Sequence, residues 1–212
     1  MIKAILFDMD GLMIDSERVT FEEYEKLLTE MGYHMTREFY CTLLGQVRNT
    51  IWSKFYHEFG DDFPIEEVWK EGTKRLDIRL LKEMPRKDGL LELLKYLKEN
   101  HYKVAVATSS GRDRVDKILE TAGVLSYIDA VVCGNEVKNG KPDPEIFLKA
   151  AEKVGAEPSE CMVLEDSEYG LHAAARAGMK AICIPDMKYP EDAFGAEVKE
   201  SLRDVIAVLE RK

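Results

Sequence analysis

The chain has 212 residues, of which 45% are hydrophobic and 33% charged, and its formal net charge is −10. This composition is typical of a globular protein with one large domain, or with a main domain and a small partner. The negative charge argues against a general binder of nucleic acid or of anionic membranes, but not against a small anionic substrate in a locally positive site. No apolar run reaches the roughly 18 residues that a membrane-spanning helix needs.

The four cysteines are widely spaced and form no C-x-x-C pair. Three of them lie in or beside apolar runs that are typical of buried strands: Cys133, Cys161 and Cys183. We therefore expect buried thiols in the reducing cytoplasm, rather than disulfides or metal ligands. The short apolar segment at the N-terminus leads directly into carboxylates, which is not the pattern of a signal peptide.

The apolar run at residues 2–7 predicts a buried strand that ends at Asp8 and Asp10, with Gly11 free to turn the chain. Side chains at positions i and i+2 of a strand point the same way, so these two carboxylates should stand together. Open α/β sheets place their ligands at the carboxyl ends of strands. Two like charges this close are costly unless a metal ion or a proton separates them.

Residues 16–84 contain no segment that reads as a strand. Apolar residues recur there at helical spacing and predict four helices, the first after the N-cap candidates Asp15 and Ser16. We expect the aromatic side chains of the third helix to form a small core, although a stacking surface for substrate is an alternative. Arg48 follows Gly45, Gln46 and Val47 between two helices, where it could either reach a neighbour or be an ordinary surface arginine.

From residue 88 onward the pattern alternates between helices and short apolar strands. Strands are predicted at residues 103–107, 128–133, 161–164 and 180–184, with helices between them and a last helix near residues 202–209. Continuous apolar strands in this alternation indicate a parallel sheet covered on both faces. We predict an α/β fold in which a doubly wound, Rossmann-like parallel sheet (residues 1–15 and 85–212) is interrupted by an all-helical domain (residues 16–84).

The carboxyl ends of all strands in such a sheet lie on one edge, so the residues that follow them should converge. These residues are four carboxylates, a cluster of three hydroxyls near a helix start and one lysine: Asp8, Asp10, Glu165, Asp166, Thr108, Ser109, Ser110 and Lys141. The set fits phosphoryl transfer, because phosphate oxygens need hydrogen-bond donors and positive charge. The hydroxyls could equally be simple helix caps, and Lys141 could be a solvated loop residue with Lys138 competing for its role.

The carboxylates suggest how such chemistry would be divided. Oxygen ligands such as Asp8 and Asp166 suit magnesium rather than zinc or copper. One carboxylate of the first pair can act as a nucleophile and form an aspartyl-phosphate, while the other carries the proton to the leaving oxygen and later activates water. A calcium loop is disfavoured because Leu12 stands where its next ligand should be, and both G-x-G-x-x-G and the Walker phosphate loop are absent.

Four short motifs occur in order at the predicted strand ends. They are FDMDG at residues 7–11, TSS at 108–110, GKPDP at 140–144 and EDS at 165–167. With these motifs the chain resembles, over essentially its whole length, the haloacid dehalogenase-like superfamily of aspartate-nucleophile phosphohydrolases. The resemblance is to the branch that includes β-phosphoglucomutase and many small-metabolite phosphatases.

The resemblance implies a role for each candidate residue. Asp8 would be the nucleophile and a Mg²⁺ ligand, and Asp10 the general acid/base that also gives the metal its backbone carbonyl. Thr108, with Ser109 beside it, would bind the phosphate, and Lys141 would orient it. The second acidic pair completes the metal site, Asp166 as a ligand and Glu165 as a ligand or close support.

Residues 16–84 resemble the helical cap that selects the substrate in this superfamily. Arg48 matches a cap arginine that grips a distal phosphate in the mutases. Thr20 stands where the β-phosphoglucomutases have a histidine, and Leu44 where they have a lysine. Both departures argue against mutase activity, and the resemblance is greatest to the phosphatases of the branch.

We therefore expect a Mg²⁺-dependent phosphatase that hydrolyses a small phosphorylated metabolite, such as a sugar or nucleoside phosphate. The alternatives are a phosphosugar mutase and a non-catalytic phosphate-binding domain on the same fold. Neither nucleic acid nor a membrane is expected as a partner, and the protein is expected to be a monomer or a small homo-oligomer.

Overall fold

A parallel sheet of six strands forms the core of the α/β unit in the computed structural model, which describes residues 1–44, 46, 48–82 and 84–211. The strand order is β3-β2-β1-β4-β5-β6 and every neighbouring pair is parallel, which confirms the predicted sheet. The strands are β1 (Ala4–Phe7), β2 (Lys103–Thr108), β3 (Ala130–Cys133), β4 (Cys161–Glu165), β5 (Lys180–Cys183) and β6 (Glu197–Val198). The strand order reverses between β1 and β4, where ligands bind in sheets of this kind.

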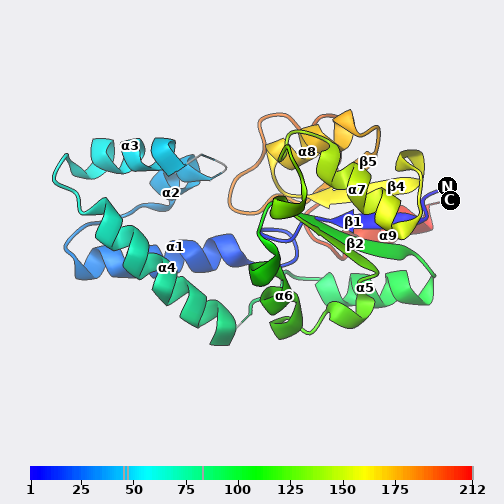
Figure 1. Ribbon diagram of the computed structural model, residues 1–212, viewed down its shortest axis with the longest axis horizontal. Helices are drawn as coiled ribbons and strands as arrows, with labels where there is room; N and C mark the ends of the chain where they lie inside the picture. The colour runs from blue at the N-terminus through cyan, green and yellow to red at the C-terminus, as the bar shows by residue number, and fades with distance from the viewer. Residues whose placement is uncertain (45, 47, 83, 212) are drawn as a thin grey trace. The chain divides into compact units, whose positions relative to one another are not determined.

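Helices cover both faces of this sheet (Figure 1). One face packs against α5 (Leu90–Glu99), α6 (Arg112–Thr121) and α9 (Asp204–Glu210), and the other against α7 (Glu145–Val154) and α8 (Glu168–Arg176). Alternate residues of β1 point to opposite faces of the sheet: Ile5 packs with the hydrophobic cluster on the first face and Leu6 with the cluster on the second. The described part of this unit also contains the short 3-10 turns η1 (Leu125–Tyr127), η2 (Gly134–Glu136) and η3 (Pro158–Glu160).

One strand of this unit is not among those predicted. The sequence does not reveal β6, because Glu197 and Val198 are exposed and a two-residue strand carries no periodic apolar signal. At the start of α7, Pro144 holds the N-cap position, and Asp143 Oδ1 accepts a hydrogen bond from the backbone N–H of Glu145 at 3.0 Å.

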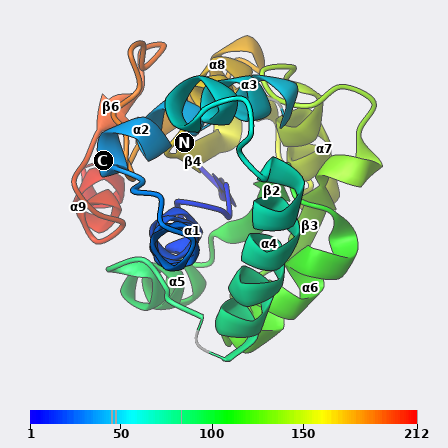
Figure 2. The same cartoon turned by 90° about the vertical axis from the view of Figure 1, so that its left-hand side faces the viewer.

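The second compact unit, Ser16–Glu83, contains the helices α1 (Ser16–Glu30), α2 (Arg37–Leu43), α3 (Arg48–Phe59) and α4 (Ile65–Lys82), while the α/β unit comprises Met1–Asp15 and Met84–Lys212. Figure 2 shows α1 end on and several turns of α4 along its length. Five aromatic rings lie together in the helical unit with centroids 4.9–5.9 Å apart: Tyr33, Phe39, Phe55, Phe59 and Phe63. The expected small aromatic core is therefore present.

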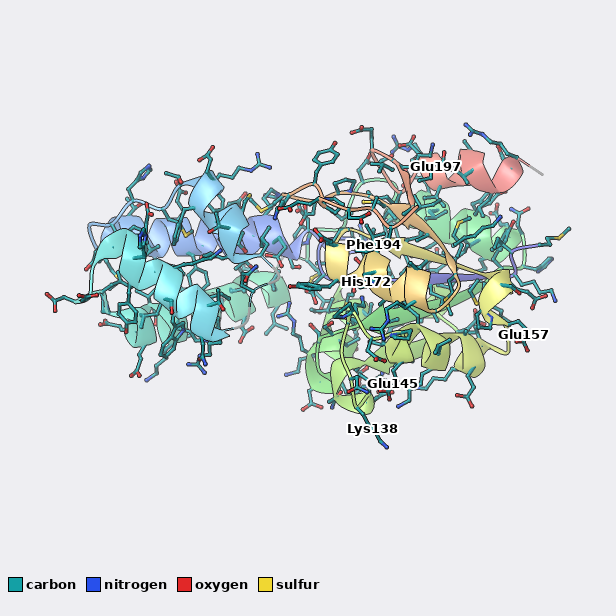
Figure 3. The ribbon with its side chains drawn as sticks, turned by 90° about the horizontal axis from the view of Figure 1, so that it is seen from above. Lys138, Glu145, Glu157, His172, Phe194 and Glu197 are labelled. Carbon is teal, nitrogen blue, oxygen red and sulfur yellow. The ribbon has the colours of Figure 1, made fainter. Side chains whose placement is uncertain are left out.

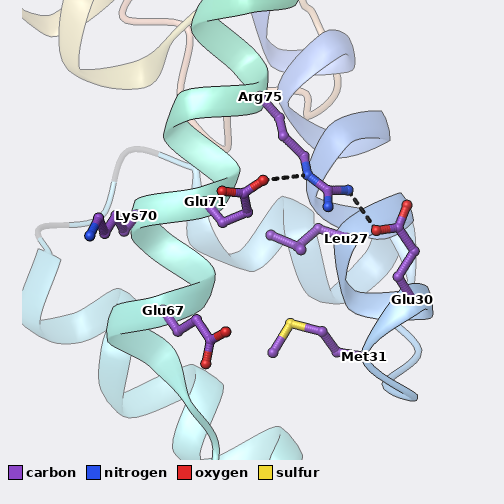
Figure 4. A pocket seen from close by; sticks show the side chains of 7 residues that line it. All are labelled: Leu27, Glu30, Met31, Glu67, Lys70, Glu71 and Arg75. Carbon is purple, nitrogen blue, oxygen red and sulfur yellow. Dashed lines mark hydrogen bonds and ion pairs between the residues drawn. The ribbon is translucent and has the colours of Figure 1, made fainter.

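Helices α1 and α4 are joined by both close packing and ion pairs. The Tyr24 ring lies against the backbone of Gly72, and Arg79 bonds Glu23 at 2.8 Å. A pocket between the two helices is lined by Leu27, Met31 and charged residues (Figure 4). Its arginine, Arg75, pairs with Glu30 at 2.8 Å and Glu71 at 3.1 Å, so these three charges compensate one another in part.

The four cysteines are free thiols, of which Cys133, Cys161 and Cys183 are buried, as the apolar runs predicted. Burial raises the pKa of Cys161 and Cys183 to about 11, so these thiols are protonated at neutral pH. Among the residues described, no helix is both long and apolar enough to cross a membrane.

Replacing Gly72 with alanine should destabilise the helical unit, although alanine is normally the better helix former by about 1 kcal/mol. An added Cβ would lie 2.5 Å from Cζ of Tyr24, whose side chain is buried and bonded through its hydroxyl to the carbonyl of Trp69. We expect Gly72→Ala to lower the free energy of unfolding by about 1–3 kcal/mol, measured by urea denaturation. The control is Gly111→Ala, where an added Cβ meets nothing within 4 Å. Equal stability of the two variants would contradict the packing described.

Candidate active site

The ammonium group of Lys141 lies between two carboxylates at the carboxyl edge of the sheet. Its Nζ donates to Asp8 Oδ1 and, at 2.7 Å, to Glu165 Oε1. Asp8 follows β1 and Glu165 ends β4, so the two carboxylates flank the point at which the strand order reverses. The side chains of Lys141 and Asp8 are 6% and 10% exposed, and that of Glu165 is fully buried. The structure thus brings together three of the predicted residues.

Burial is the main cause of the shifted pKa values of the site's carboxylates. It raises the pKa of Asp8 to about 7, against the opposing charge of Lys141. Burial alone would lower the pKa of Lys141, but the charges of Asp8 and Glu165 outweigh it and raise that pKa. Burial, followed by the charges of Glu165, Asp8 and Asp186, raises the pKa of Asp166 well above its usual range. The edge of the sheet therefore carries more negative charge than one lysine compensates, which favours the binding of a cation.

Both carboxylate oxygens of Glu165 are engaged by protein groups. Oε1 accepts from Lys141, while Oε2 accepts from the backbone N–H of Asp166 at 2.9 Å and of Ser167 at 2.8 Å. The hydroxyl of Ser167 also donates to Oε2, at 2.9 Å. The carboxylate packs so closely on Gly170 of α8 that an added Cβ there would lie 1.7 Å from Oε1. Glu165 is therefore fixed and in turn fixes Lys141.

Three carboxylates could hold a metal ion. Asp8, Glu165 and Asp166 each present one oxygen, and these oxygens lie within 4.8 Å of one another. Gly11 leaves space beside them, because a Cβ at that position would lie 2.4 Å from Asp166 Oδ2. A set made only of oxygen ligands fits a hard cation such as Mg²⁺. Since both oxygens of Glu165 are already engaged, Asp8 and Asp166 are the side chains best placed to bind it.

Asp10, the second carboxylate of the first pair, is held by two donors from the segment after β2. The hydroxyl of Ser110 donates to Asp10 Oδ2 at 2.7 Å, and Arg114 Nη2 lies 2.9 Å from Oδ1. Thr108 is almost fully buried and accepts from the N–H of Ser110 at 3.1 Å, whereas Ser109 is exposed. Sequence reasoning missed Arg114, because nothing distinguishes it from the other charged residues of α6.

The loop that carries Lys141 is tied down by Glu145. Its carboxylate accepts from the backbone N–H groups of Lys138 and Asn139 at 3.0–3.1 Å, and Lys149 pairs with it at 2.8 Å. Figure 3 labels Glu145 and Lys138 on this side of the α/β unit. Lys149 and these N–H groups lower the pKa of Glu145 to about 2. The side chain of Lys138 is exposed. Lys141, and not Lys138, is therefore the lysine that reaches the carboxylates.

Arg48 lies in the helical unit as the first residue of α3. Its guanidinium carbon is 4.6 Å from the ring centroid of Trp52 and 5.4 Å from that of Trp69, so cation–π contacts hold it. Its neighbours Gly45 and Val47 in the predicted cap motif lie outside the described residues. The expected contact between Arg48 and a distal phosphate stays a prediction.

The chain is similar to proteins of known family, both in sequence and in structure. The family model described as haloacid dehalogenase-like hydrolase matches residues 5–184. The chain is 33% identical over 184 residues to a phosphorylated carbohydrates phosphatase of Thermotoga maritima, covering 85% of this chain and 84% of that one. It is 29% identical over 183 residues to the fructose-1-phosphate phosphatase YqaB of Escherichia coli, covering 85% and 95%. The crystal structure of a haloacid dehalogenase-like protein from Agrobacterium tumefaciens has a TM-score of 0.85 at 28% identity, covering 99% and 98%.

Replacing Gly170 with alanine should displace Glu165 and leave Lys141 with one partner. Breaking a buried ion pair in this way typically costs about 3–5 kcal/mol, and a loss of that order in the free energy of unfolding is expected. The control is Gly140→Ala, beside Lys141, where an added Cβ meets nothing within 4 Å. Urea denaturation of both variants measures the difference. A Gly170→Ala protein as stable as its control would show that Glu165 is free to move.

The contribution of Glu145 to stability should depend on pH. Its pKa is lower in the folded protein, about 2, than its ordinary value of 4.5. Its stabilising effect is therefore complete above pH 4.5 and is lost as the pH falls towards 2. We expect Glu145→Gln to be less stable than the parent protein at pH 7, with the difference shrinking as the pH is lowered through this range. Glu152→Gln, an exposed position on the same helix, should show no such trend in urea denaturation.

Proposed function

Since the chain belongs to the haloacid dehalogenase-like hydrolase family and is a phosphohydrolase, we propose that it is a Mg²⁺-dependent phosphatase of small phosphorylated metabolites. A sugar phosphate or a nucleoside phosphate is the proposed substrate, and the reaction passes through an aspartyl-phosphate. The observation that carries this proposal is the Lys141 ammonium between Asp8 and Glu165, with Asp166 beside them. It combines a nucleophile with the positive charge that a phosphoryl group needs.

In the first proposed step a carboxylate oxygen of Asp8 attacks phosphorus, and the bond from phosphorus to the ester oxygen breaks. Asp10 gives its proton to that leaving oxygen, so the alcohol departs neutral. In the second step Asp10 takes a proton from a water molecule whose oxygen attacks the same phosphorus. The bond from phosphorus to Asp8 breaks, inorganic phosphate leaves, and both aspartates return to their starting state.

Other residues position these two carboxylates. Lys141 holds Asp8 and supplies positive charge to the phosphate oxygens, and Glu165 holds Lys141. Ser110 and Arg114 hold Asp10. Thr108 and Ser109, at the carboxyl end of β2 before α6, are proposed to donate hydrogen bonds to the phosphate.

Mg²⁺ is the proposed cofactor because the acidic groups outnumber the lysine that compensates them. Asp8, Asp166 and the backbone carbonyl of Asp10 would hold it, and Glu165 would support the site through Lys141. When bound, it supplies positive charge that neutralises the phosphate oxygens and keeps the nucleophile ionised.

The helical unit is proposed to act as the cap that selects the substrate, with Arg48 as the contact to a distal anionic group. A phosphosugar mutase is less consistent with the residues of this unit. Thr20, at the position of the mutase histidine, uses its hydroxyl to bond the carbonyl of Ser16 at 2.8 Å. Leu44, at the position of the mutase lysine, has no charge to offer a phosphate.

A Mg²⁺-dependent phosphate-release screen over sugar, nucleoside and glycolytic phosphates tests the proposal. We expect hydrolysis of at least one of these esters and a loss on the order of 10³-fold or more in Asp8→Asn, because the nucleophile is removed. The control is Asp61→Asn, an exposed position in the helical unit. Hydrolysis by Asp8→Asn within tenfold of the parent rate would contradict the assignment.

Two further outcomes of this screen would select the alternatives. Isomerisation of a hexose 1-phosphate faster than phosphate release, in the presence of a bisphosphate activator, would indicate a mutase. Binding of Mg²⁺ and phosphate without release from any ester would indicate a non-catalytic phosphate-binding domain.

A further inference from the structure

A further carboxylate, that of Asp186, lies beside the three that could hold a metal. It follows β5, at the same edge of the sheet as Asp8 and Asp166, and its side chain is 9% exposed. A Cβ built on Gly11 would lie 2.4 Å from Asp166 Oδ2 and 3.3 Å from Asp186 Oδ2. The two oxygens are therefore at most about 5.7 Å apart and border the same gap, which exists because Gly11 has no side chain.

Lys87 holds Asp186 from the other side. Its Nζ donates to Asp186 Oδ1 and lies 3.8 Å from Asp15 Oδ1. The backbone of Lys87 is fixed as well, since its N–H donates to the carbonyl of Met13 at 2.9 Å. Lys87 is thus anchored to the chain that leaves β1, and its side chain is 19% exposed.

The segment that contains Asp186 is tied to α8 rather than hanging free. The ring of Phe194 stacks on that of His172, with centroids 4.4 Å apart and planes at 1° (Figure 3). The N–H of Glu191 donates to Glu168 at 3.2 Å. These contacts fix the far end of the segment, while the bond to Lys87 fixes Asp186 itself.

The placement of Asp186 has an electrostatic cost. It brings a second buried carboxylate close to Asp166, and like charges in a medium of low dielectric repel strongly. Repulsion alone would turn Asp186 away from the gap. The ammonium of Lys87 offsets part of this repulsion and is bonded to Oδ1, while Oδ2 borders the gap at Gly11.

We propose that Asp186 and Lys87 are a positioning pair for the divalent cation: Asp186 accepts hydrogen bonds from water that the cation retains, and Lys87 holds Asp186 in place. Mg²⁺ gives up its water reluctantly and keeps several molecules in protein sites, so an outer acceptor has a partner. Outer acceptors of this kind orient the bound ion and raise its affinity. This inference rests on the proposed function, because it requires a cation at Asp8 and Asp166.

Isothermal titration of the intact protein with Mg²⁺ alone tests the inference without any substrate. Asp186→Asn keeps the shape of the side chain but removes its charge, and we expect it to weaken Mg²⁺ binding about 10-fold. The control is Glu191→Gln, which loses the same charge from the same segment at an exposed position and should bind Mg²⁺ as the parent does. Equal affinities of Asp186→Asn and Glu191→Gln would overturn the inference.

The variant Lys87→Met distinguishes two possible roles of Lys87: holding Asp186 in position, or only adding positive charge near the metal site. If Lys87 holds Asp186, its loss weakens Mg²⁺ binding, and the double variant binds no more weakly than Asp186→Asn. If Lys87 only lowers the negative potential, its loss tightens binding, and that result overturns the pair. Circular dichroism and thermal unfolding of each variant establish that it is folded before the titration is interpreted.

Asp166→Asn distinguishes failure of this inference from failure of the proposed function. If the parent protein binds no Mg²⁺, or if Asp166→Asn binds it normally, the proposed metal site is contradicted. The inference about Asp186 and Lys87 is then contradicted as well. Normal binding by the parent, loss in Asp166→Asn and no effect of Asp186→Asn would overturn the inference alone.

Discussion

The rest of the site depends on the ion pairs that the buried ammonium group of Lys141 makes with Asp8 and Glu165. These two carboxylates come from neighbouring strands and are both buried. An ionised carboxylate in a buried environment is costly in free energy unless it is paired. Lys141 pairs with both, so that one cation offsets two anions. The negative charge that this lysine leaves uncompensated is also what makes the edge of the sheet attractive to a metal ion.

The sheet explains why these residues meet. β1 and β4 are neighbours although about 150 residues separate them in sequence, and the order of strands reverses between them. The helical unit is inserted immediately after β1, and the two ends of the insertion are joined by a hydrogen bond from the N–H of Asp15 to the carbonyl of Pro85 at 2.9 Å. The chain therefore leaves the α/β unit and returns to it at neighbouring points.

Much of this was predictable from the sequence, for physical reasons. Continuous apolar strands that alternate with helices indicate a parallel sheet, and the residues after the strands must then share one edge, which placed Asp8, Lys141 and Glu165 together. The same rule could have found Asp186, which follows the last long strand. Arg114 and Lys87 could not be found in this way, because side-chain contacts between residues distant in sequence leave no periodic signal. β6 is too short to have a pattern.

The stereochemical course at phosphorus tests most directly whether Asp8 is the nucleophile. A substrate that the screen identifies would be prepared with a chiral, isotopically labelled phosphoryl group, and the configuration of the product would be determined. Two successive in-line displacements, first by Asp8 and then by water, each invert the configuration, so net retention is predicted. Net inversion would show that water attacks the ester directly, and would contradict an aspartyl-phosphate on Asp8.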